Sequence, residues 1–230
     1  MWAWALLPIF LAVWAIVGVW IVYAMAVSNG SVNLNDGFPV ISTCGSYPPQ
    51  SCIFGQVLNV GAFLAVWILV MRFQQIRDYG CHSHLNSVSL AIGCFCALGT
   101  SLVANFQQSI QLETHLAGAF LAFFFGNIYF WMQTVLTYKV EPRHGGRWIV
   151  PTRFILSMAC TVFNVLMVVF FTQNMKSLAA ICEWVVAMII FVLFGLFSVE
   201  FWHLDMMSLH VQKRRTAIPN EMQVSTITLQ

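Results

Sequence analysis

AWALLPIFLAVWAIVGVWIVYAMAV, residues 3–27, runs for 25 residues without a charged side chain. A helix needs roughly 17–25 residues to cross a hydrocarbon core about 30 Å thick. The bilayer core offers no water to the backbone, so a single spanning segment must satisfy its own N–H and C=O groups as a helix. Residues 3–27 are therefore predicted to form a transmembrane helix.

A cleaved signal peptide is the competing interpretation of this stretch, because Ala24-Met25-Ala26 resembles a signal-peptidase site. No positive residue precedes the apolar run, and the run is longer than the roughly 7–15 residues of a signal sequence. We therefore expect the first helix to be retained.

Five further apolar runs have the length of a membrane span. They lie at about 53–71, 87–104, 116–138, 154–171 and 181–201. The runs lack the alternation of a barrel strand, so the fold class is all-α: a polytopic six-helix membrane bundle over residues 1–201. Residues 202–230 form a cytosolic tail that we expect to be disordered.

Composition agrees with a protein built in lipid. The chain is 60% hydrophobic and 8% charged, whereas about 25% of residues are charged in a typical soluble domain. These values exclude a soluble enzyme. The net charge of +2 and the lack of a basic stripe also argue against nucleic acid as a partner.

Basic residues predict the orientation, because cytoplasmic loops carry an excess of Lys and Arg. Lys176 is the only Lys or Arg residue on one side of the predicted spans. The other nine lie on the opposite side: Arg72, Arg77, Lys139, Arg143, Arg147, Arg153, Lys213, Arg214 and Arg215. Both termini are therefore predicted to be cytosolic.

The longest outer loop, residues 28–52, carries the candidate modification sites. Asn29-Gly30-Ser31 is a sequon for N-glycosylation at Asn29. Cys44 and Cys52 share this loop, where an oxidising compartment permits a disulfide. Free thiols, or a bridge from either cysteine to Cys182, are alternatives that spacing alone does not decide.

No catalytic, cofactor or metal site is predicted. Cys81-His82-Ser83-His84 lacks the second ligand group that a structural zinc site needs, so we interpret it as a solvated loop. Glu183 and Glu200 lie at opposite ends of the last span, where interfacial anchoring or a local ion pair is expected.

Neutral polar residues and small residues predict helix contacts inside the bundle. Small residues let helix backbones approach closely, and buried amides form hydrogen bonds between helices. The small residues form a ladder at Gly118, Ala122 and Gly126, and the deep polar residues are Asn59, Thr100, Asn127, Gln133 and Asn164.

The string ISTCGSYPPQSCIF, residues 41–54, followed by Gln56-Val57-Leu58-Asn59, resembles the signature region of the transmembrane protein 150 family. That family belongs to the group that contains the damage-regulated autophagy modulators. Further matching segments are Gly99-Thr100-Ser101, Asn105-Phe106-Gln107, Thr114 to Phe120, Cys182 to Met188 and Val199 to Phe201. The resemblance covers nearly all of residues 1–201 and does not extend into the tail after about Trp202.

The resemblance implies a non-enzymatic modulator of macroautophagy that promotes autophagosome accumulation and flux and favours survival under nutrient stress. It implies the cell membrane, endosome membrane and autophagosome membrane as locations. Members of the family also suggest two alternatives: a scaffold that recruits a phosphatidylinositol 4-kinase complex, and a component of a mechanically activated ion channel. The predicted partners are the lipid bilayer, and anionic lipids or other membrane proteins; no specific protein partner is identified.

Overall fold

The computed structural model describes residues 3–81, 83–141 and 145–204, which form helices and connecting loops without a β-strand. Six of the helical segments are long and apolar enough to cross a membrane. The prediction of an all-α, six-span protein is therefore confirmed. His82, Arg143, the basic cluster at 213–215 and most of the predicted tail lie outside the described residues.

Each span is a helix or a run of consecutive helices. In chain order the spans are η1 and α1 (Ala3–Ala5, Leu6–Ser28), α3 (Gln50–Asp78), α4 (His84–Asn105), α5, η3 and α6 (Leu112–Phe120, Leu121–Phe125, Gly126–Lys139), α7 (Ile149–Thr172), and α8 and α9 (Lys176–Gly195, Phe197–Phe201). Two short helices, η2 (Leu34–Asp36) and α2 (Ile41–Cys44), lie between α1 and α3. Some helices extend beyond the predicted apolar runs, since polar residues continue a helix past the hydrocarbon.

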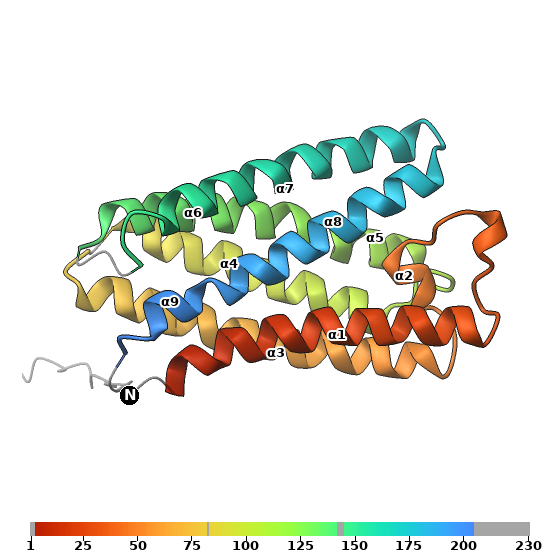
Figure 1. The fold of residues 1–230 in the computed structure, drawn as a ribbon, viewed down its shortest axis with the longest axis horizontal. Helices are drawn as coiled ribbons and strands as arrows, with labels where there is room; N and C mark the ends of the chain where they lie inside the picture. Colours follow the sequence, from red (N-terminus) through yellow and green to blue (C-terminus); the bar gives the residue numbers. More distant parts are fainter. Residues whose placement is uncertain (1–2, 82, 142–144, 205–230) are drawn as a thin grey trace, which may run out of the picture.

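The spans form a closed ring along the long axis of the molecule (Figure 1). α1 packs on α3, α3 on α4, and α4 on the α5–α6 span. α6 then packs on α7, α7 on α8, and α8 returns to α1. The short helix α2 lies at one end of this ring and α9 at the other, so we name these the α2 end and the α9 end (Figure 1).

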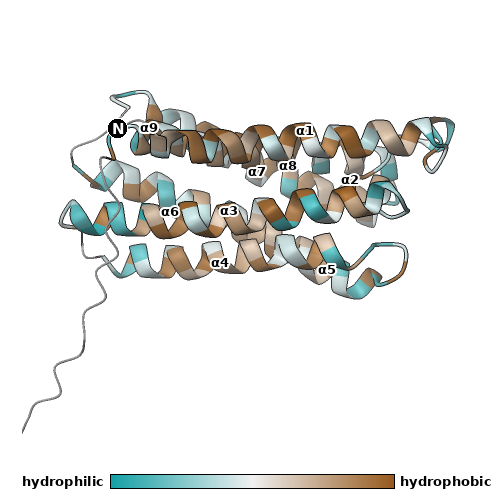
Figure 2. Cartoon of the chain, turned by 90° about the horizontal axis from the view of Figure 1, so that it is seen from below, coloured by the Kyte–Doolittle hydropathy of each residue, from teal (hydrophilic) through white to brown (hydrophobic). Residues whose placement is uncertain are grey.

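Hydropathy changes along the ring as a bilayer requires. Hydrophobic residues dominate the middle of the helices, and hydrophilic residues gather at both ends (Figure 2). Large apolar side chains are exposed around the outside, most of all on α7, of whose apolar segment only 11% is buried. Contact with lipid rather than water accounts for this exposed apolar surface.

The ladder of small residues lies inside the bundle and packs against α4. A Cβ added at Gly118 would lie 2.8 Å from Cβ of Leu102, so only a glycine permits this approach of α5 to α4. Four residues further along the ladder, the Cys96 thiol donates a hydrogen bond to the Ala122 carbonyl at 3.3 Å. The predicted close approach of backbones at this ladder is confirmed.

Candidate functional site

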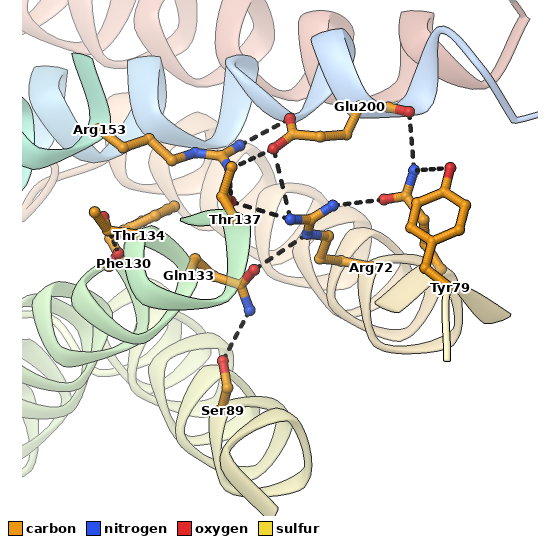
Figure 3. Close-up of polar contacts among 10 residues, drawn as sticks. Arg72, Tyr79, Ser89, Phe130, Gln133, Thr134, Thr137, Arg153 and Glu200 are labelled. Atoms are coloured by element: carbon orange, nitrogen blue, oxygen red, sulfur yellow. Dashed lines mark hydrogen bonds and ion pairs between the residues drawn. The ribbon is translucent and has the colours of Figure 1, made fainter. Parts of the chain in front are cut away.

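A buried cluster of charges lies at the α9 end of the ring (Figure 3). Its centre is Arg153 on α7, whose side chain is fully buried. The guanidinium donates to both carboxylate oxygens of Glu200 on α9, with 2.9 Å between Nη2 and Oε2. This two-pronged geometry is the strongest form of an Arg–carboxylate contact.

Arg72 on α3 is the second cation of the cluster. Its Nη2 atom lies 3.6 Å from Oε1 of Glu200, and it donates to Thr137 on α6 at 3.0 Å. It also donates to Gln133 at 3.2 Å and to Gln75 at 2.7 Å (Figure 3). Three nitrogens of this buried guanidinium therefore have acceptors.

Amides extend the cluster to a further span. Gln133 donates to the Ser89 hydroxyl on α4 at 2.8 Å, and Gln75 donates to the Glu200 carbonyl at 2.9 Å. The ring of Phe197 adds a cation–π contact, since its centroid lies 4.5 Å from Cζ of Arg153. The cluster thus joins five of the six spans: those of α3, α4, α6, α7 and α9.

This arrangement is suited to holding helices and not to proton transfer. Both oxygens of Glu200 face a guanidinium, so the carboxylate is held by fixed partners. Removing one partner of a buried ion pair leaves an uncompensated charge, which typically costs about 3–5 kcal/mol. The cluster therefore holds the spans together at the α9 end.

The structure corrects the positions predicted for Arg72 and Arg153. They were expected in cytosolic loops, but they lie within α3 and α7 and are buried. They are buried because Glu200 provides the opposite charge inside the bundle. Seven Lys and Arg residues remain on that side of the spans, against Lys176 alone. The interpretation of Glu200 as a member of a local pair is confirmed.

At the α2 end, the connection between α1 and α3 folds back onto α8. Trp184 donates from Nε1 to the Pro39 carbonyl at 3.0 Å, and the Ser177 hydroxyl accepts from the Phe38 N–H at 3.2 Å. The Trp184 ring also lies against Tyr23 and Phe38. These contacts hold residues 37–44 against the first half of α8.

Glu183 completes this attachment. It is 8% exposed and accepts from the Ser42 hydroxyl at 3.5 Å and from the backbone N–H groups of Ile41 and Ser42, at the start of α2. The two family segments around residues 41–54 and 182–188, far apart in the sequence, therefore contact each other. We call the contacts made by Ser177, Glu183 and Trp184 the loop latch.

The two cysteines of this loop differ in environment. Cys44 is buried in α2, and Cys52 is exposed in the first turn of α3; both are free thiols in the structure. Burial, with a smaller contribution from the charge of Glu183, raises the pKa of the Cys44 thiol to about 12. The Cys44–Cys52 disulfide stays a prediction.

Asn29 is exposed and follows the last residue of α1. Its Nδ2 atom, the atom that a glycan would occupy, donates to Oε1 of the buried Gln50 at 2.8 Å. Its Oδ1 atom accepts from the Ser31 N–H at 3.0 Å. Glycosylation at Asn29 stays a prediction.

Three of the deep polar side chains bind another helix, as predicted. Asn59 donates to Asn105 on α4, Asn127 to Thr161 on α7, and Gln133 to Ser89 on α4. Thr100 and Asn164 differ, because they bond within their own helices. Thr100 donates to the Cys96 carbonyl and Asn164 to the Cys160 carbonyl, each four residues back. A side chain on a helix often finds its acceptor in the preceding turn.

Within residues 3–81, 83–141 and 145–204, no group of three or more His, Cys, Asp or Glu side chains is placed to hold a metal ion. Cys81 and His84 are described, and His82 between them is not.

Comparison with known proteins gives matches to a family model and to several relatives. The family model described as "Frag1/DRAM/Sfk1/Cwh43P N-terminal domain" matches residues 3–204. "Modulator of macroautophagy TMEM150B" of Xenopus tropicalis is 75% identical, covering 100% of this chain and 99% of that protein. The Homo sapiens protein of the same name is 54% identical, covering 92% of each chain.

A more distant relative, "Transmembrane protein 150A" of Xenopus laevis, is 36% identical and covers 86% of this chain and 83% of its own. No solved structure matches the chain. The family model and the relatives cover the six spans and both ends of the ring. The chain belongs to the transmembrane protein 150 family, within the wider Frag1/DRAM/Sfk1/Cwh43P family.

Proposed function

We propose that this chain modulates macroautophagy as a non-enzymatic membrane protein. The observation that carries the proposal is the identity of 75% over the full chain with a relative named as a modulator of macroautophagy. Two physical features support a non-catalytic role. The α9-end charges are paired with each other, and the loop latch uses Glu183 to hold backbone and side-chain groups of its own chain.

The direction of the effect is part of the proposal. The chain promotes autophagosome accumulation and flux and supports survival under nutrient stress. It acts in the cell membrane, endosomes and autophagosomes, with the α9 end toward the cytosol. The bias of seven Lys and Arg residues toward that side supports this orientation.

The test is deletion of the gene followed by measurement of autophagic flux in starved cells, with and without a lysosomal block. Lower flux that the intact chain restores is the expected result. Equal flux in both genotypes would contradict the proposal. Measuring phosphatidylinositol 4-phosphate at the cell surface and tension-evoked current in the same cells separates the scaffold and channel alternatives.

Glycosylation of Asn29 provides a test of the orientation. The α2 end then faces the lumen or the outside, where the transferase acts. Wild-type protein from cells should shift in mass after glycosidase treatment, and Asn29→Gln protein should not. Epitope tags at either end of the chain, read by antibody access before and after permeabilisation, give an answer that does not depend on the glycan.

A further inference from the structure

A cavity of about 100 Å³ lies inside the ring of spans. Its walls come from α1, α3, α4, the α5–η3 segment and α8, and Ile41 and Ser42 of α2 line one end. Along α8 the lining runs from Glu183 to Phe194. The eleven rises of about 1.5 Å between these two residues give a length of about 16 Å.

The length of the lined space fits one hydrocarbon chain. About 16 Å is close to half of the ~30 Å hydrocarbon core, which is the depth that one lipid leaflet fills. Gly61 lines this space, and a Cβ added there would meet no atom within 4 Å.

The walls and the end of the cavity differ in chemistry. The walls are mostly aliphatic and aromatic, as the lining residues Leu58, Ala62 and Ile190 illustrate. Glu183 is the only lining residue with an ionisable carboxyl or amino group, and with Ser42 it lies at the α2 end of the cavity. A carboxyl group there favours a ligand group that donates hydrogen bonds or carries a positive charge.

A local change in helix geometry lies beside the cavity. Residues 121–125 form the π-helical segment η3, and Ala122 and Phe123 of this segment line the cavity. Single π-helical turns are frequent where a helix is adapted to bind something.

We propose that this cavity binds the chain of a single-chain lipid whose head group bears hydroxyl or ammonium donors, and that Glu183 and Ser42 receive those donors. The hydrocarbon chain of the lipid lies along α3 and α8, and its head group lies under α2. A carboxylate head group on a chain of the same length lacks such donors. This inference is independent of the proposed role in autophagy, because binding is measured on the purified protein.

The experiment uses the full chain in nanodiscs and three photoactivatable probes with a diazirine in the chain. The probes are sphingosine, a monoacylglycerol and palmitic acid, which carry an ammonium with hydroxyls, hydroxyls alone and a carboxylate. We expect saturable labelling of cavity-lining peptides by the first two and about tenfold less by palmitic acid. Equal labelling by all three, or labelling confined to the lipid-facing side of α7, would overturn the proposal.

Glu183→Gln separates the two possible head groups. The amide keeps a hydrogen-bond acceptor and loses the charge, so labelling by sphingosine should fall by about tenfold and labelling by the monoacylglycerol should persist. Unchanged sphingosine labelling in this variant would show that Glu183 does not receive the head group, and would overturn that part of the proposal.

Gly61→Leu places a side chain in the cavity and should abolish saturable labelling by both donor-bearing probes. Val66→Leu is the matched control, because Val66 lies on the same helix, is 37% exposed and does not line the cavity. Wild-type labelling of the Gly61→Leu variant would overturn the proposal. Competition by unlabelled sphingosine on the wild-type chain provides a test that needs no variant: without competition, the proposal fails.

Discussion

The two ends of the ring bury acidic side chains for different purposes. At the α9 end, the Glu200 carboxylate lies between two guanidinium groups, and the backbone carbonyl of Glu200 accepts from the Gln75 amide (Figure 3). At the α2 end, Glu183 holds the start of a four-residue helix and lines a cavity. The Glu200 carboxylate is enclosed by fixed partners. The Glu183 carboxylate has partners on one side and the cavity on the opposite side.

This difference shows which end can change. Charge pairs in a low-dielectric interior are strong and costly to break, so the α9 end behaves as one rigid unit. The loop latch at the α2 end consists of single hydrogen bonds, each with a net contribution of about 0.5–1.5 kcal/mol. We therefore expect loop motion and ligand entry at the α2 end.

The largest expected effect comes from Glu200→Gln. It leaves Arg72 and Arg153 without their counter-charge, and loss of a buried partner costs about 3–5 kcal/mol. Thermal unfolding of the purified protein in detergent should show a much lower midpoint or little folded protein.

Glu141→Gln is the matched control for this prediction, since Glu141 is exposed at the same end of the molecule. Replacing Arg72, Arg153 and Glu200 together by Met should restore much of the stability, because a buried ion cluster and an apolar replacement of similar size are often close in free energy. A Glu200→Gln variant as stable as the Glu141→Gln control would remove the distinction between the two ends.

Two glycines test the packing around the cavity. A Cβ at Gly18 on α1 would lie 2.5 Å from Cγ1 of Val57 on α3, so Gly18→Ala should destabilise the protein by about 1–3 kcal/mol. Gly61→Ala should be neutral or stabilising by up to about 1 kcal/mol, since alanine favours a helix and the cavity has room. Chemical denaturation of both variants measures the free energy of unfolding. Equal losses of stability in the two variants would argue against an open cavity.

Trp184→Phe should weaken the loop latch by about 1 kcal/mol, because the Pro39 carbonyl loses its donor. Amide hydrogen exchange in residues 37–44 should become about fivefold faster, while exchange at the α9 end should not change. Trp148→Phe is the control, since Trp148 is exposed. Wild-type exchange rates in the Trp184 variant would mean that the latch does not hold the loop.

The smallest effect is a difference in thiol labelling. The thiolate is the reactive form of cysteine, and a pKa of about 12 leaves little thiolate on Cys44 at about pH 8. After mild reduction, maleimide should modify the exposed Cys52 and spare Cys44 until the protein is denatured. Mass spectrometry of digested peptides measures this, and early modification of Cys44 would show that the latch opens readily. Omitting the reduction step tests the predicted disulfide.

The number and type of spans could be predicted from the sequence because uninterrupted apolar runs have few other structures available in a membrane. The helix ends were less predictable. α3 reaches Asp78, beyond the predicted end at residue 71, because Arg72 and Gln75 find partners inside the bundle. Hydropathy alone does not reveal such partners.

The charged cluster was missed because a buried arginine and a loop arginine contribute equally to a count of positive residues. Glu200 supplied the available signal: an acidic residue at the cytosolic side of a span is a natural partner for a nearby arginine. The helix α2 had no signal of its own. Four residues do not sustain a helix alone, and Glu183 and Trp184 from a distant span stabilise this segment.

The closed ring also sets an order for biosynthesis. Arg72 and Arg153 are synthesised before Glu200, which lies near the end of the last span. Until that span is inserted, both cations lack their carboxylate and α1 lacks its contact with α8. A chain that stops before residue 200 therefore presents two uncompensated positive charges and an open ring to the quality-control machinery of the membrane. Completion of the last helix closes the ring and brings one carboxylate to both cations in one step.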